Sequence, residues 1–215
     1  MNSTLPTMTT RVYVESSLLA VSFLFTAVAH LYFSYYYITQ KNKNRLSLNI
    51  FINLIVWSFC SIFGALLYCY LIFSSERLGF IIYHLGNLFT SSIVSVSGSV
   101  TMLLSDRIFV FVYPLSYRQH KRTFVWISIF FCAICFLYQM RVIFVYQLDL
   151  TRGNGCTSLG CVYRLLPEFS INLRVIIGIM NVILSIIFEI IMFIYSANSQ
   201  LHQAQFKKVT RECKA

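Results

Sequence analysis

The sequence predicts an all-α membrane protein with five transmembrane helices. Of its 215 residues, 58% are hydrophobic and 11% are charged, whereas a typical soluble domain carries about 25% charged residues. The apolar residues stand in long continuous runs, which is typical of helices that are apolar on every face. Because the backbone finds no water in hydrocarbon, these runs are expected to be helical.

Five runs have about the length, roughly 20 residues, that crosses a bilayer. They are residues 14–39, 48–73, 79–113, 124–147 and 170–196. The first ends in the aromatic stretch YFSYYY, which suits an interfacial belt. The third is long enough for a tilted span with extra turns. No proline lies inside any of the five, so we expect few sharp kinks.

The basic residues predict the orientation. Ten Lys and Arg residues lie on one side of the predicted membrane, namely Lys41, Lys43, Arg45, Arg118, Lys121, Arg122, Lys207, Lys208, Arg211 and Lys214. Four lie on the other side, namely Arg11, Arg77, Arg152 and Arg164. The richer side is expected to be cytoplasmic, so residues 1–13 would be extracellular and residues 197–215 cytoplasmic. The net charge of +10 then reflects topology and an anionic lipid bilayer, and no nucleic-acid partner is predicted.

Two features of the expected outer side agree with this orientation. Asn2 begins the triplet Asn-Ser-Thr, a glycosylation acceptor. Cys156 and Cys161 would face an oxidising compartment, where a local disulfide can form. In contrast, Cys132 and Cys135 lie within an apolar run, and we interpret them as small packing residues and not as half of a metal site.

The stretch DRIFVFVYPLSY, residues 106–117, places a charged pair at the cytoplasmic end of the third run. It resembles the end of the third helix in rhodopsin-like (class A) seven-helix G-protein-coupled receptors, whose pattern is Asp/Glu-Arg-Tyr followed by Pro-Leu and often an aromatic residue. The matching residues are Asp106, Arg107, Pro114, Leu115 and Tyr117. The richness in Phe, Tyr and Ile is most similar to the nematode serpentine chemosensory receptors.

The resemblance implies a seven-helix receptor-type bundle with a cytoplasmic switch. Asp106 would neutralise Arg107 in the closed state, and opening would free Arg107 to contact a heterotrimeric G protein. Tyr195 would be the tyrosine near the inner end of the fifth helix. An unknown small-molecule ligand would bind on the outer side, and by position alone its pocket would include Phe89, Thr90 and Ile93. Such a receptor would reside in the plasma membrane, in a sensory cilium if it is a chemoreceptor.

The chain also departs from the family. Ile108 replaces the Tyr of the triplet, and Ser58 stands where a sodium-binding Asp belongs. Helices six and seven, which the family needs, have no counterpart before Ala215. We therefore expect a receptor that is truncated after its fifth helix and whose own signalling is doubtful. A further role would be association with full-length receptors. The alternative is a true five-span protein.

Other classes of protein have less support. The sequence holds no His-rich box, no nucleophile beside a base and no glycine-rich phosphate loop, so neither an enzyme nor a cofactor or metal site is predicted. A transporter or channel of unknown substrate is the second functional hypothesis.

The polar residues within the apolar runs have predicted roles of their own. Ser91, Ser95 and Ser99, joined by Gly98, form a small-residue stripe that predicts close helix packing. Arg141 and Arg174 are expected to extend toward the interface. Glu189 could pair with Arg107, be protonated or reach the cytoplasmic interface.

Overall fold

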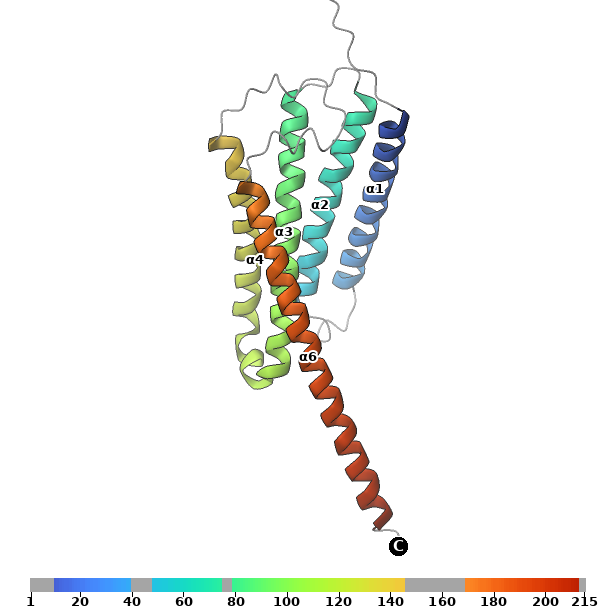
Figure 1. Ribbon diagram of the computed structural model, residues 1–215, viewed down its shortest axis with the longest axis vertical. Helices are drawn as coiled ribbons and strands as arrows, with labels where there is room; N and C mark the ends of the chain where they lie inside the picture. The colour runs from blue at the N-terminus through green and yellow to red at the C-terminus, as the bar shows by residue number, and fades with distance from the viewer. Residues whose placement is uncertain (1–9, 40–47, 75–78, 146–168, 213–215) are drawn as a thin grey trace, which may run out of the picture.

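The structure is a computed structural model that describes residues 10–39, 48–74, 79–145 and 169–212. Within these residues the chain forms five helices (Figure 1). They are α1 (Thr10–Thr39), α2 (Leu48–Phe73), α3 (Gly79–Val112), α4 (Pro114–Val145) and α6 (Phe169–Glu212). The predicted all-α class and the five predicted helices are confirmed.

Helix α3 stands at the centre of the bundle. It packs against α2, α4 and α6, while α1 packs on the outside of α2. Of the most apolar part of α3, 56% of the residues are buried, compared with 6% for α6. Side chains of α3 are therefore the ones that can connect the other helices.

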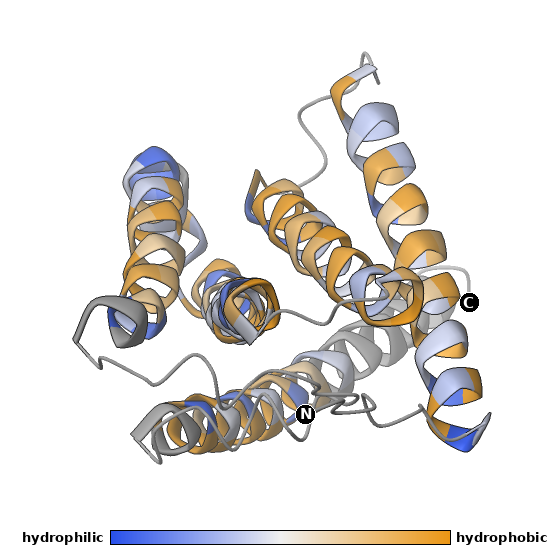
Figure 2. Cartoon of the chain, turned by 90° about the horizontal axis from the view of Figure 1, so that it is seen from above, coloured by the Kyte–Doolittle hydropathy of each residue, from blue (hydrophilic) through white to orange (hydrophobic). Residues whose placement is uncertain are grey.

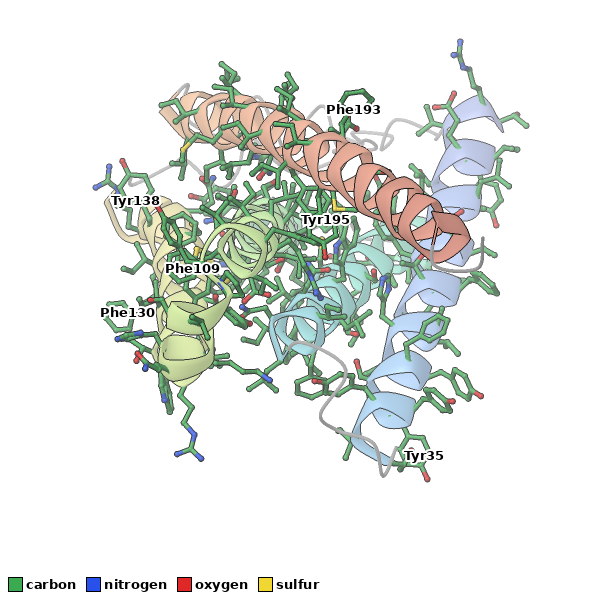
Figure 3. The ribbon with its side chains drawn as sticks, turned by 90° about the horizontal axis from the view of Figure 1, so that it is seen from below. Tyr35, Phe109, Phe130, Tyr138, Phe193 and Tyr195 are labelled. Carbon is green, nitrogen blue, oxygen red and sulfur yellow. The ribbon has the colours of Figure 1, made fainter. Side chains whose placement is uncertain are left out.

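Many large hydrophobic side chains are exposed on the outside of the bundle, and Figure 2 shows hydrophobic residues along all of the helices. Phe25, Phe130 and Phe193 are each at least 70% exposed, and Phe130 and Phe193 project from the bundle in Figure 3. An apolar surface of this extent is stable in lipid and not in water. All five helices have segments long and apolar enough to cross a membrane, so the chain is a multi-pass membrane protein.

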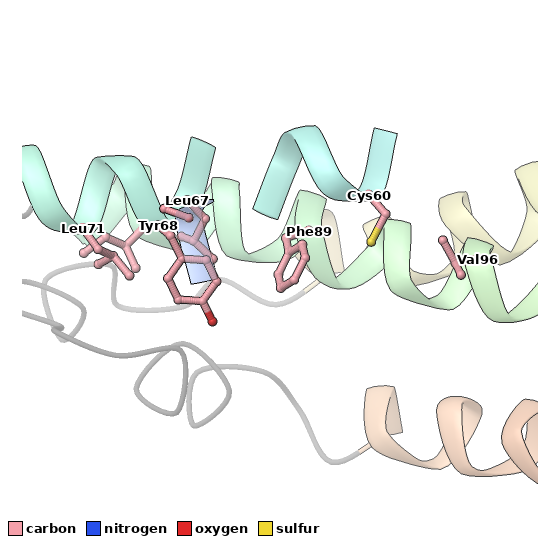
Figure 4. Packing of buried hydrophobic residues seen from close by; sticks show 8 residues of the cluster. Cys60, Leu67, Tyr68, Leu71, Phe89 and Val96 are labelled. Carbon is pink, nitrogen blue, oxygen red and sulfur yellow. The ribbon is translucent and has the colours of Figure 1, made fainter. Parts of the chain in front are cut away.

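The main hydrophobic cluster joins α1, α2 and α3 (Figure 4). Leu67 and Leu71 of α2 are completely buried. The ring of Phe23 on α1 lies edge-on to Phe89 of α3, with centroids 5.2 Å apart. Gly64 makes this approach possible, because a Cβ atom there would lie 2.9 Å from the Phe89 ring.

Three helices are longer than the predicted runs, and α1 exceeds its run least, since it begins at Thr10, four residues before the predicted residue 14. α4 begins at Pro114, ten residues before the predicted residue 124, and only Tyr113 separates it from α3. Proline suits the first position of a helix because its fixed φ is already helical and its missing N–H needs no partner there. α6 continues to Glu212, beyond the predicted residue 196, through residues rich in good helix formers such as Gln, Ala and Lys.

Candidate functional site

The most completely buried charged residue of the described bundle is Asp106, at the end of α3. Its side chain is 0% exposed. One carboxylate oxygen, Oδ1, accepts a hydrogen bond of 2.8 Å from the Asn49 amide of α2 and one of 2.7 Å from the Tyr117 hydroxyl of α4. Hydrogen bonds to a carboxylate are stronger than those between neutral groups. Asp106 thus ties the ends of three helices together.

Arg107 is half-buried beside this network but does not share it. Consecutive side chains on a helix point about 100° apart, and within the described residues no ion pair joins Arg107 to Asp106 or Glu189. Our expectation that Asp106 neutralises Arg107 therefore does not hold in this conformation. The Glu189 side chain is exposed.

The side of α3 that carries Arg107 faces α6. Phe111 follows Arg107 by four residues, so the two lie on one face of the helix. The Phe111 ring packs against Phe188 and Tyr195 of α6, with centroids 6.1 Å and 5.6 Å apart, and Tyr195 lies on the inner side of α6 in Figure 3. Arg107 and Tyr195 are consequently brought to the same interface.

An aromatic layer lies next to the Asp106 network. The Phe109 ring contacts Tyr113, Tyr117 and Phe124 at centroid distances of 5.5, 6.4 and 5.9 Å. These contacts hold the first turns of α4 against the end of α3. Pro114 starts α4, whereas Leu115 is 83% exposed and takes no part in the layer. Of the predicted switch residues, the structure thus brings Asp106 and Tyr117 into direct contact.

A second polar contact joins α3 to α6 near the middle of the bundle. The Thr101 hydroxyl donates a 2.6 Å hydrogen bond to Oδ1 of Asn181. The Asn181 amide donates in turn to the carbonyl of Ser97, at 3.1 Å. Both groups of the Asn181 amide are therefore satisfied by α3, which fixes the level at which the two helices cross.

The three residues predicted to line a ligand pocket are packed instead. Phe89 is 3% exposed within the main hydrophobic cluster, and Ile93 packs against the same cluster. Thr90 is completely buried, and its hydroxyl donates to the carbonyl of Asn87. Their position in the amino-terminal half of α3 did not indicate which face they occupy.

Several buried polar side chains near this level have hydrogen-bonding atoms that find no partner among the described residues. Among them are both amide groups of Asn87, the Ser91 hydroxyl and the Gln139 amide nitrogen. Gln139 lies seven residues beyond Cys132, whose carbonyl accepts from Ser95, so on an antiparallel helix it is level with Asn87 and Ser91. Buried polar atoms are nearly always partnered. Sequence reasoning missed these residues apart from Ser91, which we assigned to packing.

The serine stripe packs as predicted. Ser95 donates to the Cys132 carbonyl of α4 at 3.1 Å, and Ser99 accepts from the Asn53 amide of α2 at 2.8 Å. A Cβ atom at Gly98 would lie 3.1 Å from the sulfur of Cys135. The small residues of α3 therefore serve two neighbouring helices, and Cys132 and Cys135 are buried packing residues.

The two arginines expected to extend toward the interface differ from each other. Arg141 is exposed and lies over the Tyr138 ring, 4.2 Å from its centroid. Arg174 instead turns inward, and its guanidinium donates to the Thr90 carbonyl of α3 at 3.5 Å.

Three sequence-based candidates fall outside the described residues. These are the glycosylation acceptor Asn2 and the cysteines Cys156 and Cys161. Their assignments stay predictions.

Comparisons with known proteins give no relative from which a role could be transferred. No family model, no curated protein and no solved structure matches the chain. The functional argument therefore depends on the residues and contacts described above.

Proposed function

We propose that the chain is a chemosensory receptor-like membrane protein of the G-protein-coupled type. The observation that carries the proposal is the buried Asp106, which accepts hydrogen bonds from Asn49 and Tyr117 at one end of the central helix. Beside it stands the half-buried Arg107, which has no ion pair with Asp106. The fixed network and the adjacent cation correspond to the two parts of a cytoplasmic switch.

In this proposal the two residues have different tasks. Asp106 holds α2, α3 and α4 in a fixed arrangement, because breaking its contacts would leave a buried carboxylate without donors. Arg107 faces α6, the helix with the smallest buried fraction, so a shift of α6 would change the access to its guanidinium. Guanidinium groups donate up to five hydrogen bonds, and backbone carbonyls or carboxylates of a G protein are suitable acceptors.

The ligand would bind toward the other end of the bundle. Asn87, Ser91 and Gln139 offer donors and acceptors that no described residue uses. In a site from which water is excluded, each such group favours a ligand that completes its hydrogen bond. We therefore propose a small molecule with both donor and acceptor groups, bound beside α3 and α4, in place of the pocket predicted around Phe89.

The test is signalling by a chimera in which the sixth and seventh helices of a receptor of the same superfamily follow α6. The Arg107→Ala variant should abolish nucleotide exchange on the G protein while surface expression is unchanged. Arg141→Ala, which removes an exposed arginine from α4, is the matched control and should signal normally.

Equal signalling by Arg107→Ala and the parent chimera would contradict the proposal. Two results together would favour the transporter or channel hypothesis instead. Vesicles that contain the chain alone would show solute flux across the membrane, and no chimera would stimulate nucleotide exchange.

A further inference from the structure

A groove runs along the bundle between α2 and α4. Both helices pack on α3 but make little contact with each other, so α3 forms the floor. The central part of this α2–α4 groove has a volume of 490 Å³. Its wall is apolar and includes Ile55, Val56, Ile129, Cys132, Ala133 and Phe136.

The groove extends in both directions from this central part. Ile129 also lines a hollow of 390 Å³ toward the amino-terminal end of α4. Val56, Ser95 and Phe136 also line a hollow of 290 Å³ on the other side. Because neighbouring hollows share wall residues, the three follow one another along the α2–α4 groove.

The two ends of the groove differ in charge. Lys121 and Arg122 line the hollow near the amino-terminal end of α4, together with Trp126. At the other end the lining is aromatic, with Phe59, Phe63 and Phe136, and the only polar side chains are those of serines. The groove therefore offers two cations at its mouth and an apolar wall beyond them.

The apolar part of the groove corresponds in length to about one leaflet of a bilayer. Along α4 the whole lining runs from Lys121 to Leu137, which is about 24 Å on an α-helix, and its apolar part from Val125 to Leu137 is about 18 Å. Half of the hydrocarbon core measures about 15 Å. A transmembrane helix of a partner protein would need a groove through both leaflets, whereas one acyl chain needs only this length.

We propose that the α2–α4 groove binds an anionic phospholipid. The phosphate headgroup pairs with Lys121 and Arg122, and one acyl chain lies along Ile129, Ala133 and Phe136. The excess of basic residues on this side assigns the lipid to the cytoplasmic leaflet, where anionic phospholipids are abundant. The inference does not depend on coupling to a G protein.

Trp126 provides a direct test, because it lines the mouth of the groove and the chain has only two tryptophans. The Trp57→Phe variant of the full chain, which keeps Trp126, is placed in nanodiscs of phosphatidylcholine. The nanodiscs contain increasing fractions of a lipid with brominated acyl chains, and bromine quenches tryptophan fluorescence. Each basic residue near a membrane surface is expected to increase the affinity for an anionic lipid about fivefold. Brominated phosphatidylserine should therefore reach half-maximal quenching at a mole fraction about five- to thirtyfold lower than brominated phosphatidylcholine.

Three variants test the parts of the site. Lys121→Gln combined with Arg122→Gln should abolish the preference for phosphatidylserine. The matched control is Arg11→Gln combined with Arg141→Gln. It removes the same charge from the amino-terminal end of α1 and the carboxyl-terminal end of α4, away from Lys121 and Arg122, and should keep the preference for phosphatidylserine. Ala133→Phe fills the groove and should reduce the preference for phosphatidylserine although both cations remain. Far-UV circular dichroism checks that each variant is folded.

Equal quenching by the two brominated lipids would overturn the proposal. An unchanged preference for phosphatidylserine in the Lys121/Arg122 variant would also overturn it. An unchanged preference in Ala133→Phe would do the same, because it would indicate that the lipid is attracted to the surface without occupying the groove. Quenching by a brominated sterol that phosphatidylserine cannot displace would assign the groove to a neutral lipid and would equally overturn it.

Discussion

The Tyr117 hydroxyl donates a 2.7 Å hydrogen bond to the carboxylate of Asp106, so the beginning of α4 is fastened to the end of α3. The two residues are eleven positions apart, and the chain between them reverses its direction at Tyr113. Because Asp106 also accepts from Asn49, this contact is one half of a connection between three helices.

The first prediction concerns the hydroxyl itself. Tyr117→Phe should lower the free energy of unfolding by about 1–3 kcal/mol, because a hydrogen bond to a buried carboxylate is lost. The measurement is an SDS titration in mixed micelles followed by tryptophan fluorescence. Tyr113→Phe makes the same change on an exposed side chain of the same turn and should change stability by less than about 0.5 kcal/mol. Equal losses in the two variants would contradict the role of this bond.

The second prediction separates the geometry of Asp106 from its charge. Asp106→Asn keeps an oxygen acceptor for Asn49 and Tyr117, so the loss of stability should be about 1 kcal/mol. Asp106→Ala leaves the buried Asn49 amide and the half-buried Tyr117 hydroxyl without this acceptor and should cost about 2–5 kcal/mol. Both variants are compared by the same titration. If Asn and Ala were equally destabilising, the charge and not the shape of the acceptor would hold the helices.

The third prediction uses two glycines in different surroundings. A Cβ atom at Gly64 would lie 2.9 Å from the Phe89 ring and 3.0 Å from the Phe23 ring. Gly64→Ala should therefore separate α1 from α2 and α3, at a cost of about 1–3 kcal/mol. Gly178 has no atom within 4 Å of its Cβ position, so Gly178→Ala should be neutral or stabilising by up to about 1 kcal/mol. Thermal unfolding in detergent compares the two, and a larger loss at Gly178 would argue against the packing around Gly64.

The fourth prediction concerns the contact between α3 and α6. In a double-mutant cycle, Thr101→Val and Asn181→Ala should show a coupling energy of about 0.6 kcal/mol and at most about 1.7 kcal/mol, the mean and the maximum measured for hydrogen bonds between membrane helices. Ser92 donates only within its own helix among the contacts described, to the Leu88 carbonyl. A cycle of Ser92→Ala with Asn181→Ala is the control and should show no coupling. Additive effects of Thr101→Val and Asn181→Ala would exclude a direct bond.

The five helices could be predicted because every segment that crosses a lipid bilayer has to meet the same physical requirements. Each needs a long apolar run with its backbone bonded internally, and α2 has the bounds that its run predicted, Leu48–Phe73. Hydropathy predicts the start of α4 too late, because the basic residues before residue 124 are typical of a loop. A helix that continues into water carries such residues equally well, so hydropathy marks the edge of the membrane and not the end of the helix.

The candidate site was only partly predictable. Asp106 stood out as a charge at the end of an apolar run, but its partner Asn49 lies 57 positions away, and nothing in the sequence connects them. The stripe of Ser91, Ser95 and Ser99 predicted only part of the inward face of α3, because the large apolar residues around it show no periodicity that would indicate the rest. For that reason Phe89 was assigned to a pocket although it belongs to the core.

Helix α6 is continuous to Glu212, so a rotation at its contacts with α3 is carried along its whole length. Tyr195 packs on Phe111 of α3, and Glu212 lies 17 positions beyond Tyr195, or about 25 Å at the rise of an α-helix. A tilt of about 5° at Tyr195 would displace the far end by about 2 Å. A rearrangement beside Phe111 would thereby reach the part of α6 that extends beyond the other helices (Figure 1).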